Sequence, residues 1–128
     1  MRSGIAVLDV VIAASLVMSL VAVSTPMVIR VSRIWIQTRH YHLAADLLSG
    51  EMDRVLAIDS GIRNSELESL TVPAEVANVL IGAELTGDIM DTSSGRVIVL
   101  SLDWPRLGDP PPMRLTAWIN TDADGEGL

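Results

Sequence analysis

The chain contains no cysteine and no lysine, and it has only two histidines. Without cysteine it can form no disulfide and has no thiolate to act as a nucleophile or metal ligand. The histidines, His40 and His42, are two residues apart and so do not share a helix face, and no third histidine or cysteine lies near them in the sequence. Catalytic motifs such as G-x-S-x-G, H-E-x-x-H and a phosphate-binding glycine loop are also missing. We therefore expect neither an enzyme nor a cofactor.

Positive charge is scarce in most of the chain. Nine arginines stand against sixteen acids, which gives a net charge of −7. From Leu56 onward there are four arginines and twelve acids, so this half carries a charge of −8. Such a surface repels the phosphates of nucleic acids. We expect no nucleic-acid partner.

One long apolar run occupies the N-terminal region, from Ile5 to Ile29. As a helix of about 1.5 Å per residue, this run exceeds the roughly 30 Å of bilayer hydrocarbon, so residues 5–29 are predicted to span a membrane. Asp9 is the only charged residue in the run. A carboxylate at the centre of a bilayer costs about 2.5 to 3.5 kcal/mol, and less near a helix end. The position of Asp9 therefore calls for a partner or a function.

Two ordinary interpretations of this run remain open. The first is a secretory signal cleaved after Ala22-Val23-Ser24, which would leave Thr25 as the mature N-terminus, although the run is longer than the usual 7 to 15 residues. The second is a simple membrane anchor that retains Met1. Neither interpretation explains Asp9.

A third interpretation rests on the stretch G-I-A-V-L-D-V-V-I-A-A, residues 4–14. It resembles the class III signal of type IV pilins and type II secretion pseudopilins, in which a short basic leader ends in glycine and precedes an apolar helix with an acid at its fifth mature residue. The resemblance implies that prepilin peptidase removes residues 1–4 by cleaving between Gly4 and Ile5, and that the new N-terminus is methylated. It also places Asp9 at the fifth position. The family usually has Phe and Glu where this chain has Ile5 and Asp9.

The resemblance implies a role in subunit assembly for Asp9 and Pro26. In the family the acid pairs with the N-terminal amine of a neighbouring subunit and sets the axial register of the stacked helices. Pairing is also what makes a buried charge tolerable. Pro26 falls at mature position 22, where many pilins have proline, and it is expected to bend the helix because it lacks a backbone N–H.

Helical periodicity continues beyond the span. Apolar residues recur at steps of three and four along one stripe, which predicts an amphipathic helix over residues 30–60 that ends near Asp59-Ser60-Gly61. The stripe consists of Tyr41, Ala44, Leu48, Met52, Val55 and Ile58. A long helix of this kind, packed on a small domain, is the layout that the resemblance implies.

Residues 61–128 are predicted to form a small antiparallel β-sheet domain. Alternating patterns predict strands at residues 96–104 and 113–119, and a turn at residues 92–95 would pair a strand near residues 83–90 with the first of these. The polar stretch at residues 63–69 precedes them, and residues 70–82 could be a strand or a short helix. Three strands alone bury too little apolar surface, so the helix stripe must form the second layer. The expected class is α+β and pilin-like.

Three further features are candidates for binding. Trp118 faces away from Leu115 by strand parity and is the expected partner contact, whereas Trp104 is expected in the core and Trp35 at the membrane interface. Asn120, Asp122 and Asp124 resemble the first half of a calcium loop, but the closing glutamate would lie beyond the chain. We expect a frayed acidic terminus there.

By its short chain and small sheet, the sequence looks most like the I-type minor pseudopilin of type II secretion. The resemblance implies a subunit of the bacterial inner membrane with a periplasmic C-terminal domain. Its partners would be other minor and major pseudopilins, the assembly platform and prepilin peptidase. A minor type IV pilin, or an anchored or secreted binding domain that forms no polymer, is the alternative. Arg30, Arg33 and Arg39 follow the span, and charge bias alone would place the C-terminal side in the cytoplasm.

Overall fold

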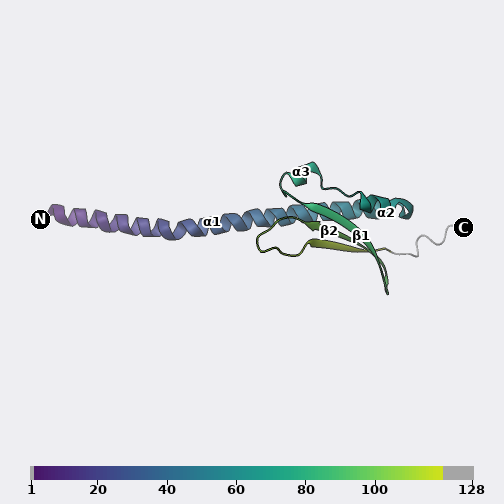
Figure 1. Cartoon of the computed structure of the whole chain (residues 1–128). Coiled ribbons are helices and arrows are strands. Elements are labelled where there is room, and N and C mark those ends of the chain that lie inside the picture. Colours follow the sequence, from purple (N-terminus) through teal and green to yellow (C-terminus); the bar gives the residue numbers. More distant parts are fainter. Residues whose placement is uncertain (1, 120–128) are drawn as a thin grey trace. The chain divides into compact units, whose positions relative to one another are not determined.

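The computed structural model describes residues 2–119 of the chain. It is an α+β structure with a long N-terminal helix, two short helices and a three-stranded sheet (Figure 1). The chain divides into two compact units, the first ending at Arg39 and the second beginning at His40. Each unit is described by itself.

Helix α1, Arg2–Ala57, contributes to both units and includes Pro26 in its interior. In the first unit its apolar side chains are exposed on every side. A helix that is hydrophobic all round must be covered by a larger protein core or by lipid. In the second unit α1 is amphipathic, and only one stripe of it is buried, by Ala44, Leu48, Met52 and Val55. The predicted helix is confirmed, and so is its stripe from Ala44 to Val55, whereas Tyr41 is 40% exposed and Ile58 lies beyond the end of α1.

The sheet has the order β1-β2-β3 and is antiparallel throughout. Strand β1 is Glu84–Thr92, β2 is Gly95–Asp103 and β3 is Met113–Ile119. The hairpin between β1 and β2 closes at the pair Thr92 and Gly95. Gly95 has a φ of 130°, which other residues rarely adopt. The predicted turn and all three predicted strands are confirmed.

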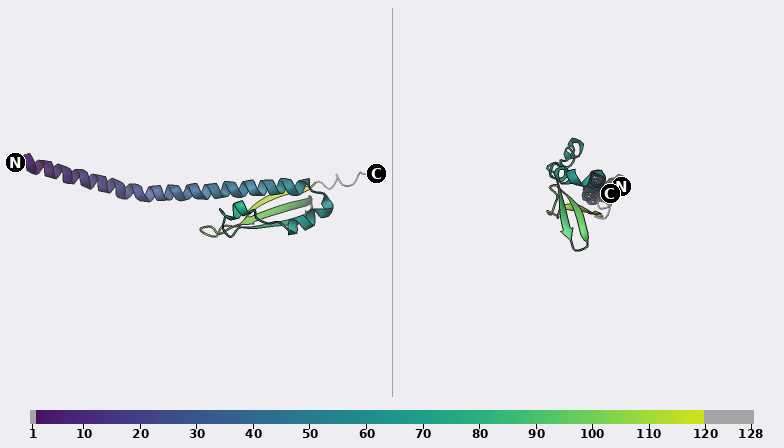
Figure 2. Two further views of the ribbon diagram at one scale, coloured as in Figure 1. Left: turned by 90° about the horizontal axis from the view of Figure 1, so that it is seen from above. Right: turned by 90° about the vertical axis from the view of Figure 1, so that its right-hand side faces the viewer.

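The core lies between the buried stripe of α1 and one face of the sheet, and in Figure 2 the strands run alongside this part of α1. Ile98, Leu100 and Leu102 of β2 are fully buried, and Leu115 of β3 is half-buried against them. This is the predicted pairing of helix stripe and sheet face. The full set of buried core residues is Ala44, Leu48, Met52, Val55, Leu67, Leu70, Val76, Leu80, Leu85, Ile98, Leu100, Leu102 and Trp104.

Two short helices connect α1 to the sheet. Helix α2, Ser60–Glu68, occupies most of the stretch that the sequence suggested only as polar, and α3, Ala74–Ala77, shows that the ambiguous region contains a short helix. Leu67 is the only residue of α2 in the buried class. A nine-residue helix with so little apolar surface has no strong periodic signal, and helices of this length depend on tertiary contacts. Those contacts explain why it forms.

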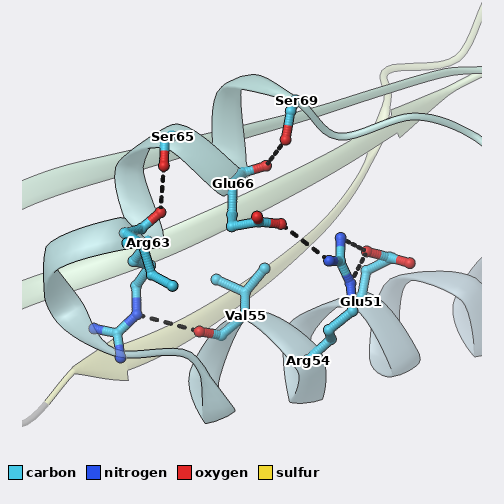
Figure 3. Close-up of polar contacts among 8 residues, drawn as sticks. Glu51, Arg54, Val55, Arg63, Ser65, Glu66 and Ser69 are labelled. Carbon is cyan, nitrogen blue, oxygen red and sulfur yellow. Dashed lines mark hydrogen bonds and ion pairs between the residues drawn. The ribbon is translucent and has the colours of Figure 1, made fainter.

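The corner between α1 and α2 is held by two arginines (Figure 3). Arg63 of α2 donates hydrogen bonds to the carbonyls of Val55, at 3.2 Å, and Ile58, at 2.8 Å, at the end of α1. The Val55 carbonyl also accepts the N–H of Ile58 at 3.4 Å, and Ile58 follows the last residue of α1. Carbonyls at a helix end lack the regular donor four residues on, and a cation there also opposes the negative end of the helix dipole. Arg54 bridges Glu51 of α1 and Glu66 of α2. Hydrogen bonding to Glu51, above all, raises the pKa of Arg54.

Helix α2 approaches β1 closely at Gly87. A Cβ atom at this position would lie 2.7 Å from Leu67 Cδ2 and 2.8 Å from Leu70 Cδ1. Gly87 pairs with Leu100 and so faces the core, where these two leucines fill the space that a side chain would occupy. Glycine at this position therefore allows the two leucines to pack against the strand.

Candidate functional site

Helix α1 is the one described helix that is long and apolar enough to cross a membrane. No residue in the most apolar part of this helix is buried by the rest of the described chain. A core helix of a soluble protein would be covered by its own chain, so length, composition and exposure together favour a membrane as the cover. A signal sequence near an N-terminus would have the same properties.

Gly4 and Ile5 lie near the start of α1, and both are exposed. A Cβ atom added to Gly4 would meet nothing within 4 Å. Glycine inside a helix is less favourable than alanine by about 1 kcal/mol. Because the space around Gly4 is open, packing within the described chain does not explain why glycine occupies this position. A requirement for glycine here would have to come from another molecule that approaches the backbone.

Asp9 is exposed on the apolar part of α1. Its neighbours one turn away on the same helix are all apolar and cannot pair with a carboxylate: Ile5, Ala6, Ile12 and Ala13. Among the described residues, no ion pair or hydrogen bond involves its side chain. The described side chains thus leave the Asp9 carboxylate without a partner.

The hydroxyl groups of the span are satisfied within the helix. Each donates to the carbonyl four residues earlier, at 2.7 to 2.8 Å: Ser15 to Val11, Ser19 to Ser15, Ser24 to Leu20 and Thr25 to Val21. Pro26 has no N–H, so the carbonyl of Ala22 lacks its usual helical donor. The helix nevertheless continues through Pro26. The Ala22 carbonyl, like the Asp9 carboxylate, thus lacks a partner in the regular hydrogen bonding of the helix.

The outer face of the sheet carries the predicted partner residue, Trp118. It is 62% exposed and lies on the face opposite Leu115, so the parity argument is confirmed. Met90, Val97 and Trp118 stand opposite one another on β1, β2 and β3 and form an apolar row. Val97 is only 5% exposed, although it lies outside the main core cluster. The outer residues of the row therefore shield Val97 and remain exposed themselves.

Trp104 is buried in the core, as predicted, and it belongs to a cluster that the sequence did not reveal. Its ring meets the Tyr41 ring edge-on at 5.5 Å, and the guanidinium of Arg106 lies over both rings. Arg106 also donates to the Tyr41 hydroxyl at 3.1 Å and to the carbonyls of Pro110 and Pro111. This cluster joins the β2–β3 loop to α1. Trp35, by contrast, is 75% exposed.

No metal centre is found among residues 2–119: they contain no group of three His, Cys, Asp or Glu side chains placed to bind an ion. His40 is half-buried and His42 is exposed. Asn120, Asp122 and Asp124 lie outside the described residues. A polar recess between α2 and β1 is lined by Asp88, Asp91, Arg96 and neighbouring residues, and Arg96 is already paired with Asp91 at 2.8 Å.

Comparisons with protein-family models, curated proteins and solved structures found no match to this chain.

Proposed function

We propose that the chain is a minor pseudopilin of a type II secretion system, a structural subunit that helps to prime or cap the pseudopilus. The observation that carries the proposal is the combination of Gly4, Ile5 and Asp9, in the class III spacing, at the start of an exposed apolar helix that continues into a small α+β domain. The long helix and three-stranded sheet are the layout that this family resemblance implies. The apolar, uncovered first part of α1 supports membrane residence.

In this proposal the chain resides in the bacterial inner membrane with residues 40–128 in the periplasm. Prepilin peptidase cleaves after Gly4, and the Ile5 amine becomes available to a carboxylate. Asp9 pairs with the amine of a neighbouring subunit, which offsets the unfavourable burial of both charges. The partners are other minor and major pseudopilins and the assembly platform, with the exposed Trp118 row as a contact surface. A minor type IV pilin would use the same residues in the same way.

The mature N-terminus tests the proposal. Expression in a host with active prepilin peptidase, followed by mass spectrometry of the membrane-extracted protein, should show a chain that begins at Ile5, with or without a methyl group. Gly4→Leu should retain the leader, because a bulky side chain obstructs close approach to the scissile bond, and Gly50→Leu should be processed normally. A chain that begins at Thr25 would indicate a secreted domain, and one that begins at Met1 a simple anchor; either result would overturn the proposal.

Export and pilus assays separate the two related functions. In a strain that lacks the gene, loss of protein secretion with normal surface pili is expected for a pseudopilin. The reverse pattern would identify a type IV pilin. Neither defect would favour a membrane-tethered domain that forms no polymer.

A further inference from the structure

In the first unit, two charged residues flank an uncharged segment that is about as long as the bilayer hydrocarbon is thick. Asp9 and Arg30 enclose residues 10–29, which contain no charged residue. Twenty helical residues rise about 30 Å, which is the thickness of the hydrocarbon core. A helix that crosses the membrane near its normal therefore has Asp9 at one boundary of the hydrocarbon and Arg30 at the other.

The boundary at Arg30 is strongly basic. Residues 1–39 contain four arginines and one acid, a net charge of +3, whereas residues 40–128 contain five arginines and fifteen acids, a net charge of −10. No acid occurs between Asp9 and Asp46. Arg30, Arg33 and Arg39 are all exposed, and none of them has an ion-pair partner among residues 2–119. Positive charge is thus concentrated where α1 leaves the apolar stretch.

The depth of each arginine follows from the helical rise. Arg33 is three residues, or about 4.5 Å, beyond Arg30, and stands on the same side of the helix. The polar layer of each leaflet is roughly 5 to 7 Å thick, so both guanidinium groups reach the phosphates of the lipids. Trp35, which is 75% exposed, follows at the outer border of this layer, where indole rings concentrate. Arg39 is about 13 Å beyond Arg30 and lies outside the layer.

We propose that Arg30 and Arg33 form a binding site for acidic phospholipid headgroups on the leaflet where α1 leaves the bilayer. Guanidinium groups donate paired hydrogen bonds to phosphate oxygens, and each cation near an anionic surface strengthens the attraction. Lipid is favoured over an acidic protein because Arg30 directly follows the apolar stretch, at the depth of the headgroups. The site also anchors α1 against the repulsion between an anionic membrane and the acidic second unit. This inference goes beyond the proposed function and does not depend on it.

Lipid selectivity is the first test. The full-length chain is reconstituted into vesicles of three parts phosphatidylcholine to one part phosphatidylglycerol, and spin-labelled lipids of both kinds report which lipid the protein retains. For the wild type we expect at least about a threefold preference for phosphatidylglycerol. Each arginine should raise the local binding constant for an anionic lipid about fivefold, and the measured preference is smaller because it averages over all lipids that surround the helix. The variant R30Q/R33Q should lose this preference, whereas R39Q should keep it. No preference in the wild type, an undiminished preference in R30Q/R33Q, or an equal loss in R39Q would overturn the proposal.

Depth is the second test, and the absence of native cysteine makes it simple. A spin label on Ser32→Cys, between the two arginines, should be in the polar layer and readily reached by a water-soluble nickel reagent. A label on Ser19→Cys, near the middle of residues 10–29, should be shielded from nickel and reached by oxygen. Equal shielding of the two labels would show that the arginines are not at the headgroup level. If R30Q/R33Q lowers crosslinking to a neighbouring subunit but leaves lipid selectivity intact, the arginines serve a protein contact and the lipid site is wrong.

Discussion

The guanidinium carbon of Arg106 lies 4.1 Å from the centroid of the Trp104 ring and 5.6 Å from that of Tyr41. The charged group is therefore held between a strand end, a loop and the long helix. Its side chain is 9% exposed, and its partners are two proline carbonyls, the Tyr41 hydroxyl and, at 3.5 Å, Asp103. The Nε atom is buried without a partner among residues 2–119. A cation so nearly buried is retained because it satisfies several groups at once.

Loss of this guanidinium should destabilise the second unit. Arg106→Ala leaves Tyr41 and the loop carbonyls without a donor, and removes the stacking on Trp104, so we expect the free energy of unfolding to fall by about 2 to 4 kcal/mol. Arg106→Lys keeps the charge but not the planar fork, and should recover less than half of the loss. Urea unfolding of residues 30–128, followed by Trp104 fluorescence in a Trp35→Phe/Trp118→Phe background, measures both changes. Equal stability of the alanine variant and the parent would show that the cluster does not support the fold.

Leu48 and Trp118 should differ sharply in their contributions to stability. Leu48 is 2% exposed in the core, and truncation of such a leucine costs about 2 to 5 kcal/mol, a large share of the stability of a small domain. Trp118 is 62% exposed, so Trp118→Ala should cost less than about 1 kcal/mol, mainly because it uncovers Val97. Thermal melts of the two variants test this order. Trp118→Ala should instead reduce crosslinking to partner subunits, and an unchanged crosslinking yield would remove Trp118 from the partner surface.

Gly87 should tolerate no large side chain. Gly87→Leu would drive the new side chain into Leu67 and Leu70, and overpacking of this kind costs about 1 to 3 kcal/mol. Gly50 provides a matched control, because it lies in α1 with open space around its Cβ position. Gly50→Ala should stabilise the chain by about 0.5 to 1 kcal/mol through helix propensity alone. Denaturant midpoints that move in the same direction for both variants would contradict the close approach of α2 to β1.

Periodic features were the ones that the sequence predicted well. The stripe of α1 repeats every three to four residues, and Ile98, Leu100 and Leu102 occupy every second position of β2, so each pattern identifies both the element and its core face. The parity of Trp118 relative to Leu115 followed from the same alternation. The turn at residues 92–95 could also be predicted from its Thr-Ser-Ser-Gly sequence, and Gly95 adopts the positive φ that glycine favours.

Features that depend on distant contacts were missed. Helix α2 relies on the hydrogen bonds of its Arg63 to the end of α1 and on the packing of Leu67 against Gly87, and neither contact is visible in a local pattern. The Arg106 cluster joins residues 65 positions apart through a loop whose path the sequence does not specify. For the candidate site, the spacing of Gly4, Ile5 and Asp9 was readable, but no ion pair or hydrogen bond among the described residues involves the Asp9 side chain, so its proposed role rests on the resemblance alone.

Asp9 should act in assembly and not in folding. Its side chain is exposed on α1, far along the chain from the core residues, so Asp9→Ala should leave the melting temperature of the second unit unchanged. Membrane insertion should be equal or improved, because the substitution removes the desolvation of a carboxylate. Association with a neighbouring subunit should nevertheless weaken, because the neighbour's N-terminal amine loses its only opposite charge within the apolar run.

Crosslinking between partner subunits in intact membranes measures this association. Asp9→Glu should retain most of the yield, because it keeps the charge and restores the longer side chain that the pilin family usually has. Asp9→Asn tests the charge with nearly unchanged shape, and we expect it to behave like Asp9→Ala, with a loss of at least about tenfold if the pair contributes about 1.4 kcal/mol. Val10→Asp in the Asp9→Asn background is the matched control, because it places a carboxylate on a different side of the same turn and should not restore the crosslinking yield. Equal crosslinking yields for the wild type and Asp9→Asn would mean that the carboxylate has no part in subunit contact, and an Asp9→Asn protein that fails to enter the membrane would assign the residue to insertion instead.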